Sequence, residues 1–317
     1  MKGLLTCCFL LAVHFYCRAQ SQVQFYYLSI GSADYEQNSK RFAEPGFVPF
    51  DNLPQAQLSA SIMSKAFEKY THAKGITLIS SPTVMITKKR LFNSLNELEA
   101  QVKKDKAKRP FIIFYYCGHG ISENMGWNQF LIPGDYTAFP GNKNFDALLG
   151  SLIFLGDITD SFLKKHYDYM VLIDCCRKEG KDSSLPERRL SYFFDQQNLE
   201  TFKIVVQGLK YLNEYHQANP VVFAITPGKV APTVTLPEQE FVRATPDDEV
   251  GPLCRRSLLV LNHFEKSREQ SMIISEYINA IISSDLDNKS PQSISYYEDK
   301  TKNAALFKLF TKLNDQR

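Results

Sequence analysis

Two short apolar runs, each ending in reactive side chains, constrain the fold of this chain more than any other feature. The first run, 111–116, is apolar and aromatic, and C-G-H-G follows it at 117–120. The second run, 170–173, is followed by D-C-C-R at 174–177. A short apolar run of this kind is typical of a buried strand in a parallel sheet. Open sheets bind ligands at the carboxyl ends of such strands, so the sequence predicts a crevice where the two runs end.

Segments with strand and helix periodicity alternate around these runs. β-branched and aromatic residues predict further strands at 23–30, 76–80 and 221–226. Apolar residues at helical spacing predict helices at 56–70, 88–102 (with Thr87 as the cap), 156–167, 199–216, 253–264 and 272–282. This alternation predicts an α/β fold, a three-layer α/β/α sandwich around a central, mostly parallel sheet of about six strands.

Cysteine and histidine side chains at the ends of neighbouring strands would form a nucleophile and its base. A thiol attacks as the thiolate, and cationic groups nearby lower its pKa. His119 would take the thiol proton and later protonate the leaving amine. Taken singly, a cysteine on a strand or a histidine in a loop is usually structural. Their joint order, spacing and placement favour catalysis, although no third residue that orients His119 is evident.

At these two motifs the chain resembles the caspase and metacaspase family. Y-Y-C-G-H-G at 115–120 stands where metacaspases have S-G-H-G, and D-C-C-R at 174–177 stands where metacaspases have D-S-C-H and caspases have Q-A-C-R. The spacing is close to the roughly 50 residues by which histidine precedes cysteine in caspases. The resemblance covers about 22–310. It implies that Cys176 is the nucleophile, that His119 is the base, and that the N–H groups of Gly120 and Cys176 bind the oxyanion.

The resemblance also bears on specificity. In metacaspases the aspartate two residues before the cysteine lines the pocket for the side chain that precedes the scissile bond, which makes Asp174 a substrate-binding residue selective for Arg or Lys. The position of a second pocket aspartate is occupied here by Ser59, which weakens the negative charge unless Asp34 or Asp51 compensates. The alternative interpretation of Asp174 is a strand-end carboxylate satisfied by backbone N–H groups.

The function predicted is a cysteine endopeptidase that hydrolyses proteins or peptides through a Cys-His dyad, after Arg or Lys. One alternative is a catalytically inactive caspase-like interaction module, against which the presence of both Cys176 and His119 argues. Another is a metal site built from 117, 119, 175 and 176. Adjacent cysteines on a strand point to opposite faces, so a tetrahedral cluster there would be strained. We expect no metal and no cofactor.

Three weaker hypotheses concern other side chains. Calcium dependence is common among metacaspases, and Asp135 and Asp182 are the candidate ligands. Arg188-Arg189 would be a self-cleavage site if the enzyme prefers basic residues, and a solvated pair otherwise. In an oxidising compartment Cys117 and Cys175 are the best candidates for a disulfide, with two inert buried thiols as the alternative.

The first residues predict a secretory signal. Lys2 precedes an apolar run at 3–16, and C-R-A at 17–19 offers small residues for cleavage after Ala19. The peptidase domain would then span 20–317, and the protein would be secreted or periplasmic. The run is too short for a stable membrane span, and a buried strand or an uncleaved anchor is the alternative. A net charge of only +3 predicts no nucleic-acid partner. The oligomeric state is left open.

Overall fold

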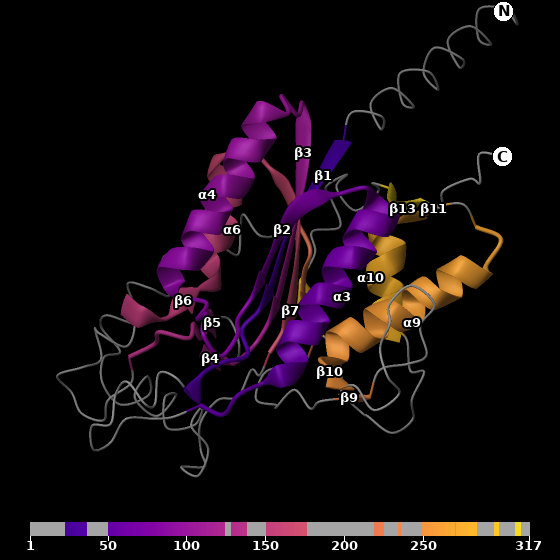
Figure 1. Ribbon diagram of the computed structural model, residues 1–317. Helices are drawn as coiled ribbons and strands as arrows, with labels where there is room; N and C mark the ends of the chain where they lie inside the picture. Colours follow the sequence, from indigo (N-terminus) through magenta and orange to yellow (C-terminus); the bar gives the residue numbers. More distant parts are fainter. Residues whose placement is uncertain are drawn as a thin grey trace, which may run out of the picture.

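The computed structural model describes residues 23–36, 50–123, 128–137, 150–175, 219–224, 234–235, 249–269, 271–283, 295–297 and 308–311. Within these residues one large sheet is covered by helices on both faces (Figure 1). The predicted leader, 1–19, and the predicted helix at 199–216 lie outside the described residues.

The large sheet has six strands. They are β1 (Val23–Gly31), β2 (Lys74–Ile79), β3 (Arg109–Cys117), β7 (Asp168–Asp174), β8 (Val221–Phe223) and β12 (Ser295–Tyr297). Their order across the sheet is β12-β8-β7-β3-β1-β2, in which every neighbouring pair is parallel except β12 with β8. The predicted sandwich with a mostly parallel sheet of about six strands is confirmed.

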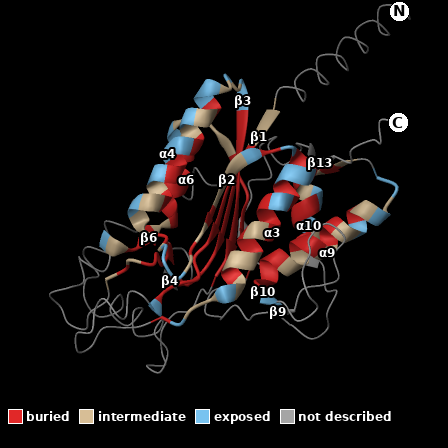
Figure 2. Ribbon diagram, in the orientation of Figure 1, coloured by how far each residue is buried: buried red, intermediate tan, exposed pale blue. Residues whose placement is uncertain are grey.

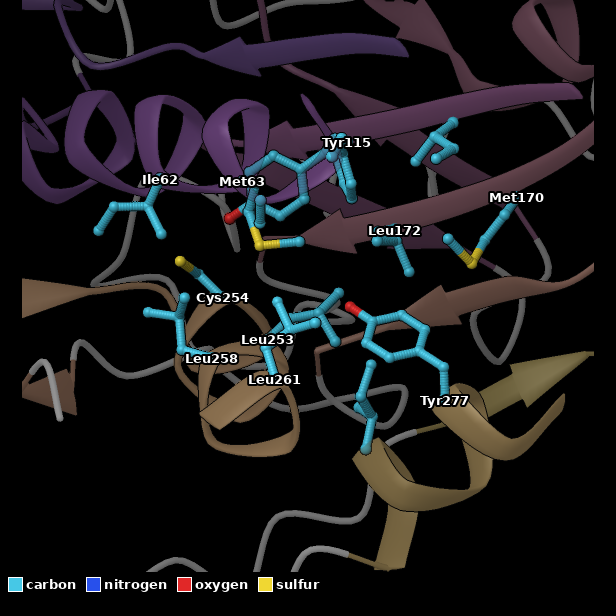
Figure 3. Close-up of a cluster of buried hydrophobic side chains, with 14 of the residues drawn as sticks. Ile62, Met63, Tyr115, Met170, Leu172, Leu253, Cys254, Leu258, Leu261 and Tyr277 are labelled. Carbon is cyan, nitrogen blue, oxygen red and sulfur yellow. The ribbon is translucent and has the colours of Figure 1, made fainter. Parts of the chain in front are cut away.

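Each face of the sheet packs against its own set of helices. Helices α3 (Pro54–Thr71), α9 (Pro252–Lys266) and α10 (Ile274–Ser283) cover one face, and α4 (Lys88–Lys104) and α6 (Leu155–Lys164) cover the other (Figure 1). Strands β1, β3 and β7 are buried along most of their length, and β2, at the edge of the sheet, is only partly buried (Figure 2). Strand alternation divides β7 between the two cores: Met170 and Leu172 join the α3/α9/α10 core, shown in Figure 3, and Val171 and Ile173 join the α4/α6 core.

Local sequence explains where helix α4 begins. The Thr87 side chain accepts a hydrogen bond from the Arg90 N–H and caps α4, as the sequence predicts. The apolar residues spaced along α4 are buried, and its intervening positions carry polar side chains. The packed stripe and the cap together place α4 beside β1 and β2.

Three smaller sheets complete the described part. They consist of β4 (Gly120–Glu123), β5 (Asn128–Leu131) and β6 (Ile153–Phe154); of β9 (Val234–Thr235) and β10 (Glu249–Val250); and of β11 (Ser271–Ile273) and β13 (Lys308–Thr311). The predicted helix at 272–282 is wrong in its first two residues, because Met272 and Ile273 pair with β13 and α10 starts at Ile274. No helix in the described ranges is long and apolar enough to span a membrane.

Candidate active site

The two motif-bearing strands are neighbours in the sheet. β3 and β7 run parallel in a register that places Cys117 opposite Asp174. His119 lies two residues beyond Cys117, and Cys176 lies two residues beyond Asp174. Both predicted catalytic residues therefore follow, in the sequence, the carboxyl ends of two adjacent and aligned strands. Cys176 itself lies outside the described residues.

The imidazole of His119 is oriented by a backbone carbonyl. Its Nε2 atom lies 2.9 Å from the carbonyl oxygen of Asp51, and the side chain is buried. A carbonyl oxygen can only accept a hydrogen bond, so Nε2 carries the hydrogen and Nδ1 is the basic nitrogen of the neutral ring. Sequence reasoning missed this partner because a main-chain carbonyl has no residue-type signature.

Aromatic rings enclose the same imidazole. The Tyr35 ring meets it edge-on at 4.7 Å between centroids, and the Phe50 ring packs at 4.6 Å. The Phe50 N–H in turn donates to the Tyr136 hydroxyl at 3.0 Å. These contacts fix the ring plane from several directions, so His119 is held in one orientation.

Gly120, predicted as an oxyanion-binding residue, sits where only glycine fits. A Cβ atom at this position would lie 2.3 Å from the Cys175 Sγ and 2.8 Å from the Gln129 Nε2. Gln129 Nε2 also lies 3.4 Å from that sulfur. The Cys175 side chain is buried in the α4/α6 core and packs directly against Gly120.

Asp174 is a buried carboxylate at the first turn of α9. Its Oδ1 accepts from the Leu253 N–H at 3.2 Å, and its Oδ2 accepts from the Cys254 N–H and the Tyr115 hydroxyl, each at 2.9 Å. Burial raises its pKa from 3.8 to about 6. These are the contacts of the alternative interpretation, a strand-end carboxylate satisfied by backbone N–H groups. Its role in substrate binding stays a prediction.

Ser59 holds the same helix end. Its hydroxyl donates to the Gln55 carbonyl at 2.8 Å and accepts from the Gly251 N–H at 2.9 Å. The two other aspartates considered for the pocket make separate contacts. Asp34 accepts from the Gln57 side chain at 3.3 Å, and Asp51 contributes its main-chain carbonyl to His119.

Of the two candidate calcium ligands, the structure describes Asp135 only. The Asp135 carboxylate accepts from the Lys88 N–H at 3.0 Å, at the start of α4. Asp182 lies outside the described residues, as does the Arg188-Arg189 pair. Over the ranges that the structure describes, no group of three or more His, Cys, Asp or Glu side chains is placed to hold a metal ion.

Of the two alternatives for Cys117 and Cys175, the structure supports two buried thiols and not a disulfide. Cys117 and Cys175 are both buried, and neither takes part in a disulfide. Cys117 belongs to the α3/α9/α10 core and Cys175 to the α4/α6 core. Cys117 pairs with Asp174, the residue next to Cys175, so alternation directs the two sulfurs to opposite faces of the sheet.

Comparison with known proteins agrees with the fold and the motifs. The model of a peptidase family described as the caspase domain matches residues 33–289, a span that includes both the histidine and the cysteine motifs. No curated protein matches the chain. Because the family match extends over most of the 317 residues, this protein belongs to the caspase domain family of cysteine peptidases.

Proposed function

We propose that this protein is a cysteine endopeptidase in which Cys176 is the nucleophile and His119 the general base. The observation that carries the proposal is the placement of His119: it follows β3, next to the strand that leads into Cys176, and its Nε2–H is directed at the Asp51 carbonyl. This tautomer leaves Nδ1 to accept the proton of a thiol.

The chemistry follows from these positions. His119 Nδ1 takes the proton of Cys176, and the thiolate attacks the carbonyl carbon of the peptide bond. The N–H groups of Gly120 and Cys176 stabilise the tetrahedral oxyanion. The imidazolium then gives its proton to the leaving amine, and water hydrolyses the acyl-enzyme with His119 acting again as base.

The nucleophile is tested with two neighbouring variants. Cys176→Ala should abolish peptide cleavage, and Cys175→Ala should only weaken it, because the Cys175 thiol supports Gly120 from below. Rates on a fluorogenic peptide and the mass of the adduct with an electrophilic peptide ketone measure both effects. Equal loss in the two variants would show that the wrong sulfur is assigned. An unlabelled wild-type protein would favour the non-catalytic interaction module.

A preference for Arg or Lys before the scissile bond is the finer part of the proposal, and its support is the resemblance at Asp174. Matched peptides with Arg, Lys or the neutral Gln at that position measure it. The Asp174 carboxylate already accepts three hydrogen bonds, so a substrate cation would bind beside these donors. Equal rates on the three peptides would remove Asp174 from the specificity pocket and leave the endopeptidase proposal intact.

A further inference from the structure

We propose that Tyr35 is a positioning residue for His119, acting through its hydroxyl on the main chain and through its ring on the imidazole. The inference rests on the proposed function and adds a residue that lies far in sequence from both catalytic motifs. Tyr35 follows β1, the strand next to β3, and its side chain is fully buried.

The main chain of His119 is held at both polar groups. Its N–H donates to the Tyr35 hydroxyl at 3.0 Å. Its carbonyl accepts from the Ile132 N–H and from the Tyr116 hydroxyl, each at 3.0 Å. The Tyr35 hydroxyl thus accepts the hydrogen bond that, in an ordinary strand, a carbonyl of the neighbouring strand would accept.

The Tyr35 hydroxyl is also tied to the structure behind it. It donates to the Ile132 carbonyl at 3.1 Å and lies 3.4 Å from the Tyr116 hydroxyl, whose single O–H is shared between the Ile132 and His119 carbonyls, each at 3.0 Å. Burial raises the pKa of Tyr35 to about 12, so the hydroxyl stays protonated at any pH at which a peptidase works. The hydroxyl is therefore a fixed acceptor for the His119 N–H.

Gly118 explains how the two hydroxyls come so close to the loop. A Cβ atom at Gly118 would lie 2.6 Å from the Tyr116 hydroxyl and 2.9 Å from the Tyr35 hydroxyl. The glycine before the histidine thus leaves space for the tyrosine pair. The motif C-G-H-G and the distant Tyr35 form one packed unit.

Ring and hydroxyl of Tyr35 act on different parts of the same residue. The hydroxyl fixes where the His119 backbone lies, and the edge-on ring contact at 4.7 Å restricts how the imidazole turns. Both are needed to keep Nε2 within reach of the Asp51 carbonyl at 2.9 Å. Small displacements of a catalytic group lower rates strongly, so the effect belongs in kcat rather than in substrate binding.

Tyr35→Phe tests the hydroxyl while it keeps the ring. We expect kcat to fall about 10- to 100-fold with KM unchanged. Tyr277→Phe is the matched control: Tyr277 is equally buried on α10, and its hydroxyl contacts Ser257 at 2.8 Å in the α3/α9/α10 core (Figure 3). Both variants lose a buried tyrosine hydroxyl, so both lower the free energy of unfolding, but Tyr277→Phe should retain wild-type kcat.

A second readout separates this inference from the proposed function. Nitrogen-15 NMR of the imidazole, assigned with a His119→Gln variant, should show the Nε2–H tautomer in the wild type and a mixture of tautomers in Tyr35→Phe. If the wild type cleaves no peptide, the proposed function fails and the tautomer still decides the role of Tyr35. Wild-type kcat together with an unchanged tautomer in Tyr35→Phe would overturn the inference. If that variant does not fold, Tyr116→Phe should give a smaller loss of kcat, because the Ile132 N–H still serves the His119 carbonyl.

Discussion

The imidazole of His119 takes its orientation from the main chain, because its Nε2 contact is the carbonyl of Asp51 and not a carboxylate. The Asp51 residue is exposed. The carbonyl would keep its place after a change of side chain, because the Leu53 N–H donates to the Ala33 carbonyl and ties the segment to the end of β1. The orienting function at this position is therefore independent of residue type.

Asp51→Ala should for this reason retain nearly full kcat. The steady-state rate on a peptide that the wild type cleaves measures this, with His119→Ala, which we expect to be inactive, as the reference. A loss of preference for basic peptides at unchanged kcat would instead assign the Asp51 carboxylate to the substrate pocket. A large loss of kcat on every peptide would contradict the main-chain role.

Asp174 makes stability depend on pH in an unusual direction. Its pKa in the folded chain, about 6, lies above the ordinary 3.8 because the carboxylate is buried. Folding therefore favours the protonated form of Asp174. The stability that this carboxyl group contributes is fully present below about pH 4 and is lost as the pH rises through 6.

Asp174→Asn removes this titration. The difference in free energy of unfolding between wild type and variant should fall by about 2 kcal/mol between pH 4 and pH 7.5. Urea denaturation at the two pH values measures it, and subtracting the variant cancels the other carboxyl groups. A difference that grows with pH would mean that the anion is stabilised in the fold, for example by a cation.

At the scale of elements, helix α9 begins with residues that cannot cap it. Gly251 at the N-cap has no side chain and Pro252 has no N–H, so the first amides that need partners are those of Leu253 and Cys254. The Asp174 carboxylate, from the end of β7, accepts from both. A negative group at a helix N-terminus is also favoured by the helix dipole. The strand that leads into Cys176 is thus joined to α9.

Ser59, on α3, also holds the start of α9, so Ser59→Ala should destabilise the protein. The change leaves the buried Gly251 N–H without its acceptor, which lowers the free energy of unfolding by about 1–3 kcal/mol. Ser61→Ala is the control on the same helix, since the Ser61 hydroxyl bonds the Gln57 carbonyl one turn earlier. Combined with Asp174→Asn, Ser59→Ala should be non-additive, because both residues hold one helix end. Strict additivity would show that the two act separately.

At the scale of the whole molecule, the candidate site lies where the strand order of the large sheet reverses. Strand β1 lies between β2 and β3. The helix that follows β1, α3, covers one face of the sheet, and the helix that follows β2, α4, covers the other. Ligands of open α/β sheets bind at such a point, beyond the carboxyl ends of the strands. Tyr35 and Asp51 arrive from the end of β1 and His119 from the end of β3.

The predicted leader is tested on the intact chain. Strand β1 begins at Val23, just after the predicted cut, so a chain that begins at Gln20 should unfold at the same temperature as the full chain. Mass spectrometry of the protein exported by its host should find Gln20 as the first residue. A mass that retains 1–19 would favour the uncleaved anchor, and a lower unfolding temperature would favour the buried strand.

The amino-acid sequence by itself determined the five parallel strands of the large sheet, most of the helices and the adjacency of the histidine and cysteine motifs. Period and residue type are local properties, and two apolar runs that end in reactive residues point to one sheet edge whatever else the chain does. The Thr87 cap belongs to the same class, since its side chain accepts from the N–H of Arg90, three residues later.

The tertiary structure alone decided which groups serve the site. Asp51 acts through a carbonyl, Tyr35 through a contact between neighbouring strand ends, and Asp174 through helix α9, which starts at Pro252, 78 residues later in the sequence. The face to which Cys117 or Cys175 points follows from strand register, which only the packed helices fix. Such contacts join residues far apart in sequence, and a main-chain partner is the same atom for every amino acid, so no local pattern predicts them.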